Sequence, residues 1–132
     1  MSDLLQQLQQ TTEGLLFPSE SDYPVVPFEW PDDAPAPSSP AAFLAAKGYA
    51  ADTPIQQLDF DTFFSFKIQD REDQDDGQRA TARQLGKVVE VLRANLSELR
   101  VYKVGNIHFD VFALGQSKDG TWMGVSTEVV ET

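Results

Sequence analysis

The segment at residues 78–99 restricts the fold more than any other part of the chain, because its apolar side chains recur every three or four positions. The residues that follow this spacing are Ala82, Leu85, Val88, Val89, Leu92, Leu96 and Leu99. A helix with 3.6 residues per turn gathers such positions on one face and leaves the charged residues on the other. We therefore predict a long amphipathic helix over residues 78–99 that packs against another layer of the protein.

The last third of the chain has a period of two instead. β-Branched and aromatic residues are frequent at residues 101–104, 107–114 and 121–130, and two turn sequences, Gly105-Asn106 and Lys118-Asp119-Gly120, separate these segments. Alternating apolar residues are typical of β-strands, and short turns between strands favour antiparallel pairing. We predict an antiparallel meander, which together with the helix indicates the α+β class.

Both faces of this sheet carry large apolar side chains. One face is predicted to hold Ile107, Phe109, Val111 and Ala113 from the middle strand and Met123, Val125, Thr127 and Val129 from the last strand. The other face carries Phe112, Leu114 and Trp122. Because apolar side chains on both faces need cover, the sheet is expected to form the middle of a three-layer arrangement.

The first forty residues combine a short helix with a proline-rich stretch. The leucines at positions 4, 5 and 8 share one helical face, with Ser2 placed to cap the helix and Gly14 placed to end it. Seven of the eight prolines lie between positions 18 and 40 and suppress regular structure there. Within that stretch we predict an ordered loop that leads into one strand, at about residues 25–30.

A second short helix and a further strand are expected before the long helix. Ser39 followed by Pro40 is typical of an N-cap and a first-turn proline, and Gly48 lies where a C-terminal glycine is common, which predicts a helix over residues 41–47. A strand is predicted over residues 55–60. Asp61 is then placed to cap a short helical turn that carries two phenylalanines.

The stretch DREDQDDG at residues 70–77 has no apolar residue and must be solvated. A calcium-binding EF-hand loop that began at Glu72 would have Gly77 at its required sixth position. Its twelfth position, however, would be Arg83, a cation where a bidentate glutamate must bind the ion. The resemblance to an EF-hand is therefore superficial.

Length and composition indicate one domain, residues 1–132, large enough to bury a core. The absence of cysteine excludes disulfides, thiolate nucleophiles and cysteine-based metal centres. The N-terminal residues do not resemble a signal peptide, and no run reaches the roughly 18 apolar residues of a membrane span. We expect a soluble cytoplasmic protein that does not interact with membranes.

The formal net charge of −11 disfavours direct binding to nucleic acid, because phosphate contacts require a cationic surface. A cationic partner would be attracted instead. Acidity of this kind also serves solubility alone in many proteins, so the charge permits a basic partner without identifying one.

The chain offers little for catalysis. His108 is the sole histidine and is predicted to share a strand face with Asp110, either as a pH-sensitive pair or, as we favour, in an ordinary surface contact between strands. Asp59 and Asp61 could present two oxygens to a metal, although capping explains Asp61 more simply. Because the standard phosphate, dinucleotide and zinc-protease motifs are missing, we expect a binding protein rather than an enzyme, with no cofactor.

Several segments, in order along nearly the whole chain, carry a family resemblance: GLLFPSESDYP, FEW, LDFDTFFS, VVEVLRANL, VYKVG, DVFALG and the terminal STEVVET. Together they resemble the cyanobacterial nuclease A inhibitor family. The resemblance implies a three-layer α/β/α sandwich with a mixed, largely antiparallel sheet, similar to plant pathogenesis-related proteins of the PR-1 type. It also implies inhibition of a Mg²⁺-dependent nuclease of the ββα-metal class.

The resemblance implies that a loop and the chain end contact the nuclease. Glu20, between Ser19 and Ser21, would occupy a phosphate position in the active site without offering a scissile bond. Thr132, preceded by Glu131, would reach the catalytic metal or its waters through its main-chain carboxylate or hydroxyl, only in the complex.

One departure concerns the loop before the long helix. Where the family's inhibitor has an acidic residue followed by an aromatic one, this chain has Glu72 and Asp73. Buried aromatic residues commonly dominate interface energy, so affinity or target identity is expected to differ. The added acid would partly compensate by speeding association with a basic nuclease.

The leading hypothesis is a 1:1 intracellular inhibitor that protects its host from its own nuclease. Glu20, Glu72, Asp73 and Thr132 would lie at the interface. An alternative is a small adaptor domain that keeps the family fold without the nuclease target. A metal-dependent enzyme that uses the surplus carboxylates is a third, weaker option.

Overall fold

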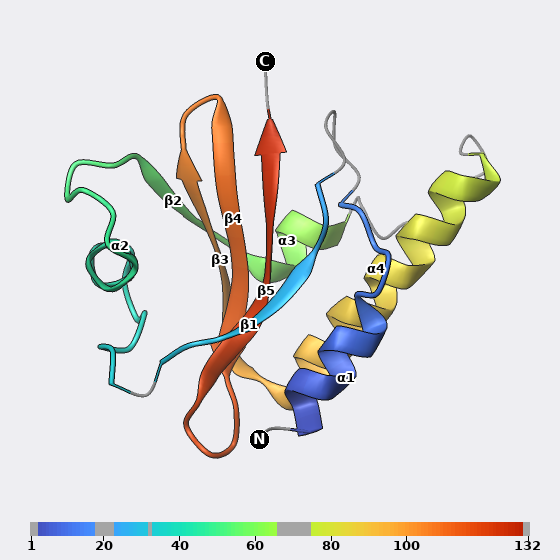
Figure 1. Cartoon of the computed structure of the whole chain (residues 1–132), viewed down its shortest axis with the longest axis horizontal. Coiled ribbons are helices and arrows are strands. Elements are labelled where there is room, and N and C mark those ends of the chain that lie inside the picture. Colours follow the sequence, from blue (N-terminus) through green and yellow to red (C-terminus); the bar gives the residue numbers. More distant parts are fainter. Residues whose placement is uncertain (1–2, 18–22, 32, 66–74, 131–132) are drawn as a thin grey trace.

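A five-stranded sheet with helices on both faces forms the protein (Figure 1). The structure is a computed structural model that describes residues 3–17, 23–31, 33–65 and 75–130. The strand order is β1-β5-β4-β3-β2, and every pairing is antiparallel. The α+β class is therefore confirmed, while no parallel pairing of the expected mixed sheet occurs among the described strands.

Within the described ranges, four helices and five strands follow one another along the sequence. The helices are α1 (Asp3–Thr11), α2 (Pro40–Lys47), α3 (Phe60–Ser65) and α4 (Asp76–Asn95). The strands are β1 (Val26–Glu29), β2 (Ile55–Leu58), β3 (Ser97–Gly105), β4 (His108–Gln116) and β5 (Trp122–Val130). The C-terminal three strands form the predicted meander, and β1 and β2 pair with its two outer strands. None of the described helices combines the length and the apolar character that a bilayer crossing requires.

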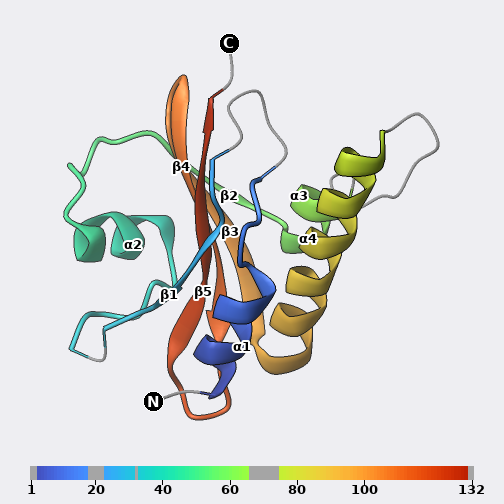
Figure 2. The same cartoon turned by 45° about the vertical axis from the view of Figure 1, so that its right-hand side comes forward.

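One face of the sheet packs against α1, α3 and α4, as the two views in Figures 1 and 2 show. The buried face of α4 consists of Ala82, Leu85, Val88, Val89 and Leu92, as the helical spacing predicts. Opposite them lie alternate residues of the central strands: Val101, Phe109, Val111, Ala113, Met123, Val125 and Val129. Burial of these two apolar surfaces against each other removes a large area from water and holds the long helix on the sheet.

The other face of the sheet packs against α2, the one described helix on that side (Figure 2). Phe43 of α2 is fully buried, with ring centroids 4.7 Å from Tyr102, 4.8 Å from Phe112 and 5.5 Å from Trp30. Such tilted aromatic pairs contribute beyond their buried area. The predicted caps of this helix are confirmed, because Ser39 accepts a hydrogen bond from the Ala42 amide and the C-cap glycine is left-handed.

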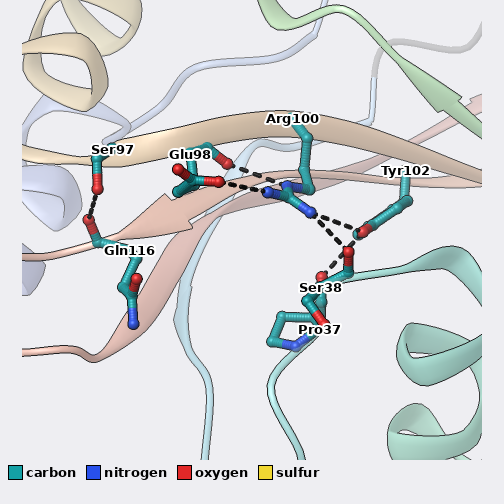
Figure 3. Close-up of polar contacts among 7 residues, drawn as sticks. All are labelled: Pro37, Ser38, Ser97, Glu98, Arg100, Tyr102 and Gln116. Atoms are coloured by element: carbon teal, nitrogen blue, oxygen red, sulfur yellow. Dashed lines mark hydrogen bonds and ion pairs between the residues drawn. The ribbon is translucent and has the colours of Figure 1, made fainter.

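Arg100 of β3 connects the proline-rich segment before α2 to the sheet by hydrogen bonds (Figure 3). Its guanidinium donates to the main-chain oxygen of Ser38 at 2.9 Å and to that of Glu98 at 3.0 Å. The fully buried Tyr102 donates from its hydroxyl to the oxygen of Pro37 at 2.9 Å. The Arg100 side chain is only 13% exposed, so these bonds have a structural role rather than forming an open binding site.

The C-terminal boundary of the long helix is the first difference from the sequence expectation. Leu96 and Leu99 continue the helical spacing, yet α4 ends at Asn95 and β3 begins at Ser97. Leu96 is already extended, and Glu98 has a positive φ of 57° where the register of β3 shifts against β4. Both leucines still pack on the same core. Their apolar character therefore could not show whether the backbone at these positions is helical or extended.

The cap of α3 is the second difference. The strand predicted over residues 55–60 ends at Leu58, and Asp59, not Asp61, caps the helix. The Asp59 carboxylate accepts hydrogen bonds from the amide and the hydroxyl of Thr62, both at 2.9 Å. Asp61 lies inside the helix and pairs with Arg93 of α4.

The Phe43→Ala substitution should lower the free energy of unfolding by about 3–5 kcal/mol, because it leaves a cavity among three aromatic rings. Urea denaturation followed by circular dichroism would measure the loss. Ile107→Ala is the matched control, since that side chain is 62% exposed; its effect should stay within about 0.5 kcal/mol. Equal losses for the two variants would contradict the packing described for α2.

The pKa of Asp59 is lowered, first by the Thr62 amide hydrogen bond and then by the Thr62 hydroxyl. Because the pKa of Asp59 is lower in the folded state, the charged cap stabilises the protein fully at pH values above the unfolded-state pKa of about 4. This contribution is lost as the pH falls through the lower folded-state pKa. The unfolding free energy of Asp59→Asn should therefore approach that of the wild type only in acid. Asp52→Asn controls for loss of one negative charge, and a constant difference between pH 7 and pH 3 would refute the charged cap.

Candidate functional site

All seven residues expected at a partner interface lie outside the described parts of the chain. They are Ser19, Glu20, Ser21, Glu72, Asp73, Glu131 and Thr132. The structure does describe the residues on which these segments begin and end. The relevant geometry is therefore that of the flanks: Phe17 and Tyr23 around the first segment, Ser65 and Asp75 around the second, and Val130 before the last.

The flanks of the first segment form a short antiparallel stem. Leu16 and Pro24 pair across it, the Phe17 amide donates to the Tyr23 oxygen at 2.8 Å, and the Val25 amide donates to the Leu15 oxygen at 3.1 Å. Leu15, Phe17 and Val25 are all buried. Two backbone hydrogen bonds and three buried anchors thus fix both ends of the segment that contains Glu20.

The stem and the end of β5 meet beside His108. The Tyr23 ring lies 5.5 Å from the His108 ring, and the Thr127 hydroxyl of β5 donates to the Tyr23 oxygen at 3.3 Å. His108 is also the register partner of Val130, the last described residue before Glu131. The segment with Glu20 and the chain end with Thr132 therefore leave the fold from neighbouring positions.

The third segment is attached to the same region through α3. The Phe63 ring stacks on the Phe17 ring at 5.7 Å with an interplanar angle of 16°. Two residues later, Ser65 is the last described residue before the acidic segment. At the other end, Asp75 is the N-cap of α4 and forms a reciprocal capping box with Gln78. The Asp75 carboxylate accepts from the Gln78 amide at 2.7 Å, and the Asp75 amide donates to the Gln78 side chain at 3.0 Å.

A cluster of titratable side chains lies next to this meeting point. His108 Nε2 is 2.7 Å from an oxygen of Glu128, and the Tyr49 hydroxyl donates to Asp110 at 2.8 Å. Burial raises the pKa of the Tyr49 phenol, and the hydrogen bond and negative charge of Asp110 raise it further, so the phenol remains a donor. Within the described ranges, His108, Asp110 and Glu128 are the one group whose ligand atoms lie close enough to hold a metal ion.

The favoured prediction for His108, an ordinary surface contact between strands, is thus confirmed. His108 makes a cross-strand contact, to Glu128 rather than to Asp110, whose carboxylate is held by Tyr49. The contact with Glu128 could have been predicted from the sequence, because a turn centred on Asp119 places Glu128 opposite Asp110. No local pattern predicts Tyr49, which comes from the segment after α2.

Comparison with known proteins supports the family assignment. A search of curated proteins found no match. A family model described as nuclease A inhibitor-like protein matches residues 2–132, nearly the whole chain. The matched range covers every described helix and strand. The chain therefore belongs to the nuclease A inhibitor-like protein family.

Proposed function

We propose that this chain is an intracellular protein inhibitor of a sugar-nonspecific ββα-metal nuclease, binding it 1:1 and acting without a cofactor or catalysis of its own. The family match over residues 2–132 carries the proposal. The structure adds support, because three segments rich in carboxylates start from a fixed and shared region of the fold. Helices on both sheet faces agree with the three-layer sandwich that the family resemblance implies (Figure 1).

The proposed mechanism is occupation of the active site by carboxylates. A nuclease binds phosphate oxygens with cationic side chains and a hard metal ion. Glu20, between Ser19 and Ser21, would take a phosphate position, and the carboxylate of Thr132 after Glu131 would reach the metal. Neither group presents a bond that the nuclease can cleave.

The hydrogen-bonded stem explains why a carboxylate at Glu20 would bind well. The two ends of the segment that contains Glu20 are held by the Phe17–Tyr23 hydrogen bond and by burial of the flanking residues. A loop with fixed ends loses less conformational entropy on binding than a free peptide. The neighbouring position of Val130 would bring the chain end into the same active site.

Charge would assist the encounter. The net charge of −11 would attract a basic nuclease over long range, and Glu72 and Asp73 are two acids of the segment that precedes α4 in the sequence. Such steering raises association rates and weakens with salt. The same charge opposes direct binding to nucleic acid.

Asp73 favours a second candidate function. The family resemblance places an aromatic residue there, and the loss of an aromatic anchor would weaken an interface centred on it. A small adaptor that retains the family fold without a nuclease partner is therefore the alternative. Inhibition assays separate the two functions.

The direct experiment adds the purified protein to a panel of ββα-metal nucleases and follows cleavage of plasmid DNA with Mg²⁺ at low salt. We expect full inhibition at one equivalent for at least one nuclease, with an inhibition constant that rises as salt increases. No slowing of any nuclease at stoichiometric protein would support the adaptor instead.

The Glu20→Gln variant and a variant that lacks Glu131 and Thr132 should each raise the inhibition constant roughly thirtyfold, about 2 kcal/mol. The first removes the carboxylate proposed for the phosphate position, and the second withdraws the terminal carboxylate by two residues. Glu90→Gln on the exposed surface of α4 is the charge-matched control and should change it less than about twofold. Circular dichroism should show unchanged folding. Full inhibition by the shortened chain would exclude a metal-reaching terminus.

Restoring an aromatic residue tests the acidic segment separately. Asp73→Trp should lower the inhibition constant by about tenfold, the size of a moderate interface hot spot. Asp73→Asn removes the same charge without adding a ring, so it isolates the aromatic contribution. If the two variants inhibit equally, this position does not contact the nuclease through an aromatic side chain.

A further inference from the structure

Three side chains on neighbouring strands project from the sheet face that α2 only partly covers. His108 and Asp110 alternate with the buried Phe109 on β4, and Glu128 lies on β5. One nitrogen or oxygen from each of the three lies within 4.8 Å of the others. An imidazole and two carboxylates are ligands that zinc-class divalent ions accept.

The strand register places two negative charges directly opposite each other. Asp110 and Glu128 are register partners on β4 and β5. Like charges at opposed positions of an antiparallel pair destabilise the sheet unless a cation lies between them. In the structure His108 contacts only the Glu128 side of this pair, with Nε2 at 2.7 Å from the carboxylate.

The surroundings orient the three groups from outside the cluster. The Tyr49 hydroxyl holds one oxygen of Asp110 at 2.8 Å, which leaves the second oxygen for another partner. The Tyr23 ring lies against the His108 ring at 5.5 Å. Hydrogen bonds of this kind to a ligating carboxylate are typical of the outer shell of metal sites.

We propose that His108, Asp110 and Glu128 form a binding site for one zinc-class divalent ion, with solvent in the remaining coordination position. Ligand bonds of about 2.0–2.2 Å in tetrahedral geometry need ligand atoms about 3.3–3.6 Å apart. His108 is exposed, and the two carboxylates are half-buried. Side-chain rotations that move the ligand atoms by about 1 Å reach that geometry without moving the strands.

The chemistry of the site discriminates between ions. An imidazole with two carboxylates suits Zn²⁺, Ni²⁺ or Co²⁺, whereas Mg²⁺ and Ca²⁺ require mostly oxygen ligands and larger coordination numbers. Binding would replace the repulsion between Asp110 and Glu128 by two ligand bonds. The site belongs to the isolated chain and does not depend on any nuclease.

Zinc titration of the untagged protein tests the site directly, because His108 is the sole histidine and gives one set of imidazole NMR signals. We expect one equivalent of Zn²⁺ by calorimetry, a shift of the His108 signals at the same equivalence, and a rise in Tm of about 5–10 °C at hundredfold excess over Kd. A thousandfold excess of Mg²⁺ should not displace the ion.

Variants assign the ligands. His108→Gln and Glu128→Gln should each abolish the calorimetric signal, and Tyr49→Phe should weaken Kd about tenfold by freeing Asp110. Glu90→Gln is the charge-matched control and should bind zinc as the wild type does. Circular dichroism checks that each variant folds, and Tyr49→Phe keeps all three ligands should a ligand variant unfold.

Two outcomes would overturn the proposal. Zinc binding that persists in His108→Gln, or that Mg²⁺ displaces, would place the ion in carboxylates elsewhere, such as those at residues 70–76. Absence of binding at millimolar Zn²⁺ would mean that His108 and Glu128 form only an ion pair between strands.

Discussion

The pairing of β4 with β5 is the constraint on which the rest of the structure depends. β4 is the central strand, and its alternate side chains enter both cores, with Val111 and Ala113 toward α4 and Phe112 and Leu114 toward α2. A shift of one residue would exchange the two sets, so packing fixes the register. Gly124 is part of this constraint, since a Cβ there would lie 1.9 Å from the main-chain oxygen of Ala113.

The same register determines which titratable residues lie opposite each other where β4 begins and β5 ends. Once Ala113 is opposite Val125, Asp110 must lie opposite Glu128 and His108 opposite Val130. The titratable cluster and the exit of the chain end are thus consequences of core packing. The ring contacts Tyr23–His108 and Phe17–Phe63 then place the antiparallel stem and α3 at this region.

Elements with one strong period could be predicted from sequence, and those decided by tertiary contacts could not. The buried face of α4, both caps of α2 and the meander follow from local patterns. The end of α4 does not, because Leu96 and Leu99 satisfy the core equally well in extended backbone. Asp59 caps α3 in place of the predicted Asp61, because β2 ends at Leu58, two residues before the predicted end of that strand.

For the candidate site, the family resemblance indicated which segments would contact a partner. The positions at which these segments leave the fold depend on ring contacts and strand register between residues that are distant in sequence.

The two flanks of the acidic segment are fixed by contacts among residues of the packed part of the fold. The flanks of residues 66–74 are held by the Phe63–Phe17 ring contact and by the Asp75 capping box, neither of which uses the segment's own side chains. The ends of the segment are therefore positioned by the packed part of the fold, as is common for connecting segments on a rigid scaffold.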